Sequence, residues 1–246
     1  MKSIKLATTT LLILICATLL VGGPNITRKT LDLPEFNSIY VNSGYTVYLK
    51  QSNKQEVTIE VLSEIYDVSE FKVESGTLHI NIQKKPKDPN ASIWDKIDNF
   101  KIAPTMKVYV SVRDVKTLKI NGNGNIISEN SIASNDLDLA LNGIGTMELD
   151  IKGREVKTSI TGAGSITLKG YASTNEISIG GSGNLNAFDC ELTYATATIS
   201  GPGQCEINVT DELKGTVYGN GIIKHKGATK TVTKKEYGQG EVARAY

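Results

Sequence analysis

The stretch ISIGGSGNLNAF (residues 177–188) decides the fold of this chain. Apolar and polar residues alternate on both sides of Gly181-Ser182-Gly183, which is the pattern of two β-strands that each bury one face. A glycine between two strands supplies the positive φ angles that residues with a Cβ avoid. Taken alone, the glycine pair also fits a phosphate loop or a calcium turn, so the choice depends on the rest of the chain.

The same unit recurs along the C-terminal half of the 246-residue chain. Seven Gly-x-Gly units begin 18 to 21 residues apart, at Gly122, Gly143, Gly162, Gly181, Gly201, Gly219 and Gly238. Two residues before each first glycine stand Ile120, Leu141, Ile160, Ile179, Ile199, Val217 and Glu236. Four residues after it stand Ile126, Met147, Ile166, Leu185, Cys205, Ile223 and Val242. Repetition in register indicates stacked units, with the polar Glu236 in the terminal copy as a cap.

A unit of about 20 residues cannot bury its own apolar face, whereas stacked copies bury a continuous core. The sequence therefore predicts an all-β solenoid, a parallel β-helix with two or three short strands per rung and rungs about 4.8 Å apart. The rows of Asp138, Lys157 and Glu176 should form an outward column of alternating charge. The glycines expected at the corners are Gly122, Gly124, Gly143, Gly145, Gly162, Gly164, Gly181, Gly183, Gly201, Gly203, Gly219 and Gly221.

The domain organisation follows from where the pattern holds. Residues 28–246 are predicted to form one β-helix domain, with the regular repeats in 117–246 and an inserted loop at 84–101. Residues 1–23 carry Lys2 and Lys5 before an apolar run, which is typical of a signal peptide or an N-terminal membrane anchor. Both readings favour an exported protein in the periplasm, the outer membrane or at the cell surface.

The two cysteines of the repeat region are predicted to stay unpaired. Cys205 lies four residues after its first glycine and Cys190 lies nine after its own. Stacked rungs bring equal offsets together, and five strand residues span about 16 Å, which exceeds the reach of a disulfide. Cys205 falls in the buried row.

No catalytic, metal-binding or cofactor-binding residues are predicted. Every Gly-x-Gly leads into a strand and not into a helix, which argues against a nucleotide loop, and the turns lack the Asp of calcium β-rolls. His225 reads as a satisfied edge histidine. In the carboxylate columns, Lys157 separates Asp138 from Glu176, so a polysaccharide-degrading enzyme is the less favoured reading. A net charge of +1 gives no reason to expect nucleic acid as a partner.

Residues 30–225 resemble a known family. FNSIYVNSGYTVYLKQ (36–51), the strand GTLHI (76–80) and the serial units ITGAGSI, IGGSGNL and ISGPGQC are similar to the auto-transporter adhesin head GIN domain family. The resemblance implies a right-handed β-helix, an exported protein of Bacteroidetes type and an adhesin-like role. It brings no catalytic residues to this chain.

The sequence thus favours a non-enzymatic envelope protein that presents a polar outer face to a surface glycan or to a protein. The alternative is a structural or regulatory envelope protein that binds another protein. Its contact would be an apolar face in the inserted loop formed by Ile93, Trp94, Ile97 and Phe100. The N-terminal segment is a further candidate for membrane contact, and the oligomeric state stays open.

Overall fold

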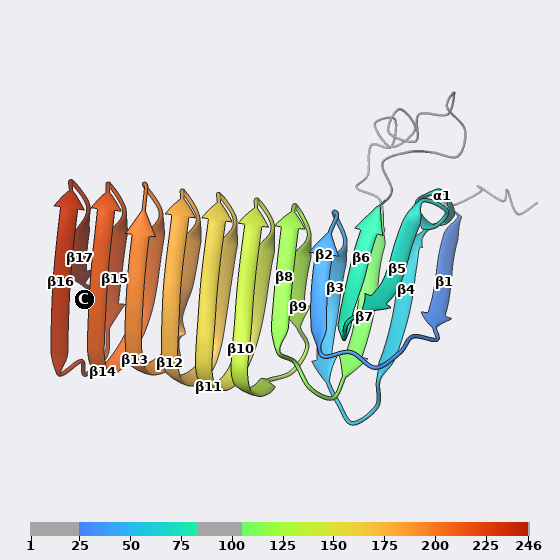
Figure 1. Cartoon of the computed structure of the whole chain (residues 1–246), viewed down its shortest axis with the longest axis horizontal. Coiled ribbons are helices and arrows are strands. Elements are labelled where there is room, and N and C mark those ends of the chain that lie inside the picture. Colours follow the sequence, from blue (N-terminus) through green and yellow to red (C-terminus); the bar gives the residue numbers. More distant parts are fainter. Residues whose placement is uncertain (1–24, 83–104, 246) are drawn as a thin grey trace, which may run out of the picture.

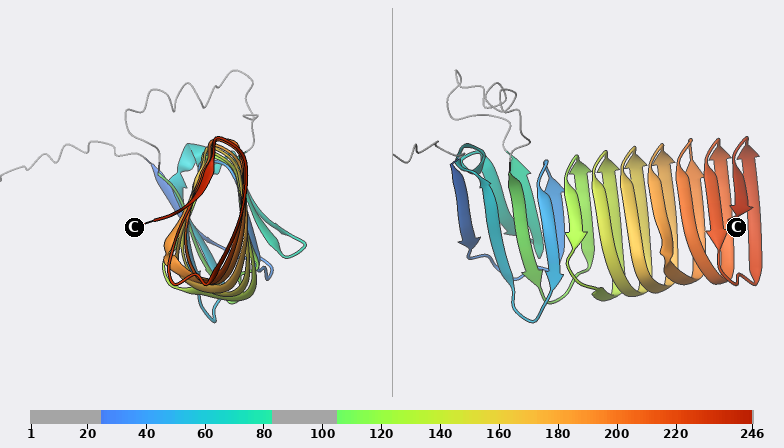
Figure 2. Two further views of the ribbon diagram at one scale, coloured as in Figure 1. Left: turned by 90° about the vertical axis from the view of Figure 1, so that its left-hand side faces the viewer. Right: turned by 180° about the vertical axis from the view of Figure 1, so that it is seen from behind.

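The computed structural model describes residues 25–82 and 105–245, which form a β-solenoid of about seven turns (Figure 1). Strands stack side by side along a straight axis, and the view down this axis shows a flattened tube (Figure 2). The predicted β-helix is confirmed. The predicted N-terminal segment 1–23 and inserted loop 84–101 lie outside the described residues. Within the described ranges, no helix is both long and apolar enough to cross a membrane.

The elements fall into an N-terminal part and a regular part. The N-terminal part holds β1 (Ile26–Leu31), β2 (Ser38–Asn42), β3 (Thr46–Gln51), β4 (Glu56–Leu62), α1 (Ser63–Tyr66), β5 (Ser69–Glu74), β6 (Thr77–Ile82) and β7 (Met106–Val112). The regular part holds β8 (Thr117–Gly122), β9 (Asn125–Ser128), β10 (Ile132–Gly143), β11 (Thr146–Gly162), β12 (Ser165–Gly181), β13 (Asn184–Ser200), β14 (Gln204–Gly219), β15 (Ile222–Lys226), β16 (Thr231–Gly238) and β17 (Glu241–Arg244).

The rungs of the regular part pair in parallel and in the register that the glycines predict. Ile160 lies beside Ile179, and Gly162 beside Gly181. The predicted column is also confirmed, because Lys157 pairs with Asp138 on one side and with Glu176 on the other. Since the side-chain period of a strand is 2, this register turns every apolar row into the core.

The expectation of two or three short strands per rung is wrong. Each of β11, β12 and β13 is one strand of 17 residues that runs from one Gly-x-Gly to the next. The Gly-x-Gly turns form one edge of the solenoid, the turn edge, and the chain curves without a break around the other, the bend edge (Figure 1). At the bend two consecutive residues face outward, and these pairs are Asn135–Asp136, Arg154–Glu155, Ser173–Thr174, Thr193–Tyr194 and Asp211–Glu212.

The N-terminal part of the β-helix predicted over residues 28–246 also contains antiparallel strands. Strand β4 pairs antiparallel with β1 and β7, and β5 pairs antiparallel with β6. The reversal between β5 and β6 occurs at Ser75 and Gly76, both with positive φ (48° and 74°). Such a two-residue turn joins antiparallel strands directly, and no Gly-x-Gly unit separates them.

The glycines of the turn edge serve two different purposes. The first glycine of each pair has positive φ, for example +97° at Gly181, and a Cβ there would lie 2.7 Å from the carbonyl oxygen of Gly162 in the neighbouring rung. The second glycine has ordinary φ, but a Cβ on Gly183 would collide with the Ile160 side chain in the core. Conformation excludes other residues at the first position, and packing excludes them at the second.

The described cysteines, Cys190 and Cys205, are both free and both buried. Burial raises the pKa of each thiol to about 12, so both remain protonated and behave as small core residues. The prediction that they do not pair is confirmed, and the structure adds that Cys190 belongs to the core as well.

The C-terminal rung closes the core with charged side chains. Glu236 occupies the predicted break in the buried row beside Val217, and its Oε1 accepts a hydrogen bond from the Val242 backbone N–H at 2.7 Å. The Lys234 Nζ donates to the Val242 carbonyl. Two side chains thus take the place of a further strand at this end, which is the behaviour of a capping repeat.

His225 lies inside this end of the tube and is only 3% exposed. Its Nδ1 has no hydrogen-bond partner among the described residues, so the expectation of a satisfied histidine is wrong. Burial lowers its pKa, and the positive charges of Lys234 and Arg244 lower it further. Partner groups at this position are scarce because the neighbouring row residue on β14 is the aliphatic Ile207.

Replacing Gly181 by Ala should destabilise the fold by a few kcal/mol, because the new Cβ adopts a disfavoured φ and meets a backbone oxygen. The matched control is the adjacent Gly180→Ala. Its φ is not positive, and its Cβ would contact only the Ile160 oxygen at 3.9 Å. That variant should stay within about 0.5 kcal/mol of the parent. Urea unfolding measures both, and equal midpoints would contradict the role assigned to the first glycine.

Acid should loosen the C-terminal rungs through His225. In the unfolded chain histidine titrates near 6.5, whereas the folded pKa is lower, so below that pH the unfolded state binds the extra proton. Stability should therefore fall as the pH drops from 7 through 6.5 and level off below the folded pKa. The variant His225→Leu should show a smaller loss between pH 7 and pH 5, measured by thermal unfolding. Parallel curves for the two proteins would contradict this assignment.

Candidate functional site

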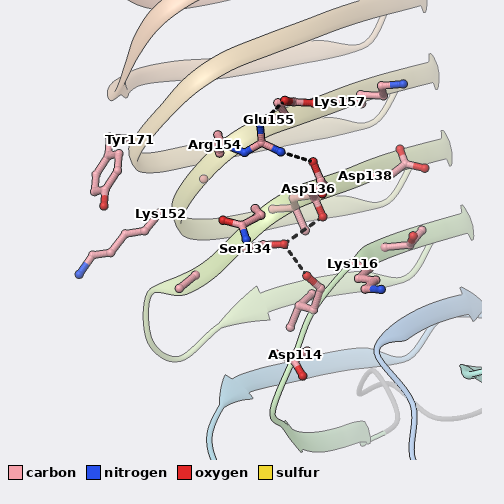
Figure 3. Close-up of a pocket in the computed structure, with 16 residues that line it drawn as sticks. Asp114, Lys116, Ser134, Asp136, Asp138, Lys152, Arg154, Glu155, Lys157 and Tyr171 are labelled. Carbon is pink, nitrogen blue, oxygen red and sulfur yellow. Dashed lines mark hydrogen bonds and ion pairs between the residues drawn. The ribbon is translucent and has the colours of Figure 1, made fainter.

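A hollow of the described surface lies at the bend edge, where the regular part begins. It has a volume of about 960 Å³ and is called the edge groove here (Figure 3). It is formed by the segment that leads into β8 and by the bends of β10 and β11, with one residue of β12. Its lining residues include Asp114, Lys116, Ser134, Asp136, Asp138, Lys152, Arg154, Glu155, Lys157 and Tyr171.

The edge groove exists because the hydrogen-bond ladder is incomplete at this point. Strand β9 ends at Ser128, and residues 113–116 link β7 to β8 without strand structure. The start of β10 therefore pairs with β11 on one side but has no strand on the side that faces the N-terminal part. The Gln51 side chain takes that place. Its Oε1 accepts from the Ala133 N–H at 2.7 Å, and its Nε2 donates to the Ala133 and Arg113 carbonyls at 2.9 and 3.0 Å.

In the reciprocal arrangement, the Asn130 side chain bonds the backbone of Gln51. Its Oδ1 accepts from the Gln51 N–H and its Nδ2 donates to the Gln51 carbonyl, both at 2.9 Å. On the other wall, the Ser134 hydroxyl lies 2.8 Å from the Val115 carbonyl and 2.9 Å from the Asp136 carbonyl. These side-chain bonds fix the backbone on both sides of the groove, so the groove is held in shape by the scaffold.

The charges of the edge groove balance. Four acidic residues (Asp114, Asp136, Asp138, Glu155) face four basic ones (Lys116, Lys152, Arg154, Lys157). Arg154 lies at the centre, with Nη2 3.3 Å from Asp136 Oδ1 and Nη1 2.6 Å from Glu155 Oε1. All three side chains are more than half exposed, so the pairs contribute little to stability and remain accessible to a ligand.

An aromatic ring stands at the rim. Tyr171 is 53% exposed and pairs in register with Lys152, so that both extend from the bend edge beside the charged centre (Figure 3). A second hollow of about 350 Å³ is lined by Glu35, Phe36, Asn53, Gln55, Arg113 and, shared with the edge groove, Asp114. The shared residue makes the two hollows neighbours along the bend edge, which suits an elongated ligand.

Catalytic and metal-binding arrangements are not found in the described part of the chain. Residues 25–82 and 105–245 contain no group of three or more His, Cys, Asp or Glu side chains that could hold a metal ion. Arg154 pairs with both Asp136 and Glu155, so each of these two groove carboxylates is engaged by the same guanidinium. Glu206, an outward carboxylate on β14, is paired with Lys224 at 3.3 Å.

The structure separates the residues that the sequence singled out. The corner glycines lie along the turn edge, away from the edge groove, and Ile93, Trp94, Ile97 and Phe100 lie outside the described residues. Asp138 and Lys157 do line the groove. Sequence reasoning missed Arg154 and Tyr171. The available signal for Arg154 was the doubled outward position seven and eight residues before each first glycine, and Tyr171 lies outside that pair.

The fold defines a β-solenoid protein without a recognisable catalytic centre in its described residues. Comparison with known proteins identifies its family. Residues 35–229 match the family model described as "Putative auto-transporter adhesin, head GIN domain", and the chain belongs to this family. A "putative adhesin" from Bacteroides fragilis superposes with a TM-score of 0.80 at 23% identity, covering 91% of this chain and 98% of that one.

Two further crystal structures share the fold. A "putative lipid binding protein" from Parabacteroides distasonis has a TM-score of 0.72 at 22% identity, covering 90% of this chain and 97% of that one. A "putative adhesin" from Parabacteroides merdae has a TM-score of 0.68 at 22% identity, with 92% and 98% covered. No curated protein matches the sequence. At these identities the likeness establishes the fold alone.

Replacing Gln51 by Met should cost about 1–3 kcal/mol, because a side chain of similar length is kept while its bonds to Ala133 and Arg113 are lost. The control is Lys50→Met on the neighbouring exposed position, which should stay within about 0.5 kcal/mol. Denaturant unfolding measures stability, and amide hydrogen exchange at Ala133 reports the local effect. Unchanged exchange at Ala133 in Gln51→Met would contradict the role of the side chain as a substitute strand.

Proposed function

We propose that the protein is an exported, non-enzymatic binding module of the cell envelope that holds a neutral glycan in the edge groove. The observation that carries this proposal is a hollow with balanced charges and an exposed tyrosine at its rim. The family description supports an adhesive role, and the N-terminal segment supports export to the periplasm, the outer membrane or the cell surface.

The chemistry of the lining favours a glycan over other polar polymers. Four acidic and four basic groups leave no net field to attract a nucleic acid or an anionic lipid surface. Sugar hydroxyls both donate and accept, so one ring can bond a carboxylate and a guanidinium at once. Tyr171 adds an apolar ring surface with a polar tip, which suits the C–H face of a sugar.

The scaffold favours binding over catalysis in the same hollow. A rigid groove fixed by backbone and amide hydrogen bonds keeps its shape when a ligand enters, which lowers the entropy cost of binding. The paired Arg154, Asp136 and Glu155 can exchange their mutual contacts for contacts to hydroxyls.

An array of neutral and acidic oligosaccharides tests the proposal with purified protein. The parent should bind neutral members, and Tyr171→Ala and Arg154→Gln should each weaken that binding about tenfold, equivalent to about 1.4 kcal/mol. Asn186→Ala, an exposed change on the opposite side of β13 from the core, is the control and should bind like the parent. Absence of any neutral glycan binding, or equal binding by both groove variants and the parent, would overturn the proposal.

A further inference from the structure

A second surface with binding chemistry lies at the C-terminal end of the solenoid. Tyr218 on β14 and Tyr237 on β16 pair in register, and their rings stack with centroids 5.0 Å apart and planes inclined by 7°. Their side chains remain 48% and 55% exposed. One face of each ring covers the other ring, so the exposed area lies on the outer ring faces and edges. We call this pair the tyrosine stack.

The column that continues from the tyrosine stack is built from small residues. Ser200 lies beside Tyr218, and Gly180 lies beside Ser200. Neither has a side chain long enough to cover a tyrosine ring. Thr198 and Thr216 occupy the adjacent outward column and are half-buried. The free face of Tyr218 therefore adjoins a flat floor that carries hydroxyl groups.

A comparison within the same molecule distinguishes this pair from a purely structural one. Tyr48 and Tyr109 also stack on adjacent strands, with centroids 5.2 Å apart and an angle of 17°. They are partly buried, and β4 continues the sheet beyond them with Thr58 beside Tyr109. Stacking across a ladder thus does not require the exposure seen at Tyr218 and Tyr237.

We propose that the tyrosine stack and its floor form a second glycan subsite, in which a pyranose ring lies with its C–H face on Tyr218 and bonds the hydroxyls of Ser200 and Thr198. Each feature selects this ligand class. The tyrosine ring supplies apolar area, and the hydroxyls supply hydrogen-bond donors and acceptors. The small residues Ser200 and Gly180 in the neighbouring rungs leave room for a sugar ring beside Tyr218. Lys235 is exposed in the column beside Tyr237, and its positive charge disfavours binding of a cationic ligand over the tyrosine rings. This inference rests on the glycan class of the proposed function but uses none of the edge-groove residues.

NMR of protein with ¹³C-labelled tyrosine tests the subsite directly. Methyl β-D-glucopyranoside, methyl β-D-galactopyranoside and methyl α-D-mannopyranoside serve as separate probes. At least one should shift the ring signals of Tyr218 and Tyr237 in a saturable way. Tyr218→Phe should keep the response at Tyr237, whereas Tyr218→Ser should remove it. Backbone amide spectra that differ only in β13, β14 and β16 show that the variants fold.

The outcomes separate this inference from the proposed function. Shifts at Tyr171 without shifts at Tyr218 and Tyr237 would leave the edge groove standing and overturn the second subsite. Shifts confined to the tyrosine stack would support the subsite and contradict the groove. A stronger response to tetramethylammonium than to all three glycosides would show a cation site and overturn the assignment. On the oligosaccharide array, Tyr218→Ser should bind about fivefold more weakly than Tyr218→Phe.

Discussion

The contact between glycines of successive rungs is the constraint on which the rest of the structure depends. The backbone of one turn rests on the backbone of the turn before it, and a Cβ on Gly162 or Gly181 would stand 2.6 or 2.7 Å from a carbonyl oxygen of that neighbour. Only a residue without a Cβ allows this approach, and the positive φ of the same residues demands glycine for a second reason. Each rung must therefore bring its glycines back to the same place, which sets a length near 20 residues and keeps every outward row in register.

Because the rungs stack in register, equivalent residues of successive repeats form columns. The inward columns build the core, and the outward columns form the surface. Inward rows are fixed by packing, whereas an outward residue such as Ser178 can change without altering the turn. The edge groove lies where this regularity stops. Residues 113–116 form no strand there, and Gln51 supplies the missing ladder bonds to Ala133, 82 residues away in sequence. A hollow on a solenoid thus arises from an interruption in stacking that side chains repair only locally.

The same distinction explains which parts of the molecule the sequence predicts. The rung register, the buried Cys205 and the polar cap at Glu236 all follow from periodic spacing, because glycine turns and alternation are local signals that repeat. The antiparallel strands β4 and β5, the continuous bends and the edge groove do not follow from it. The groove depends on single contacts between distant residues, such as Gln51 with Ala133, and the β5–β6 hairpin depends on one turn at Ser75 and Gly76, so a pattern search has no period to detect in either place. His225 was misjudged for a related reason, since hydrogen-bond satisfaction depends on the residues in neighbouring rungs.

A rigid scaffold changes what the two proposed glycan sites can achieve together. The edge groove centres on Arg154 in β11 and the tyrosine stack begins at Tyr218 in β14, so three rung steps, about 14 Å along the axis, separate them. They also lie at different edges, since Arg154 is at a bend and Tyr218 directly precedes a turn glycine. A single sugar cannot reach both, but an extended polysaccharide can, and the second contact then forms without a further loss of translational freedom. The solenoid holds the spacing fixed, so the gain depends on the length and stiffness of the polymer. With glycan held at both proposed sites, stronger binding of an extended polysaccharide than of a single sugar follows from that geometry.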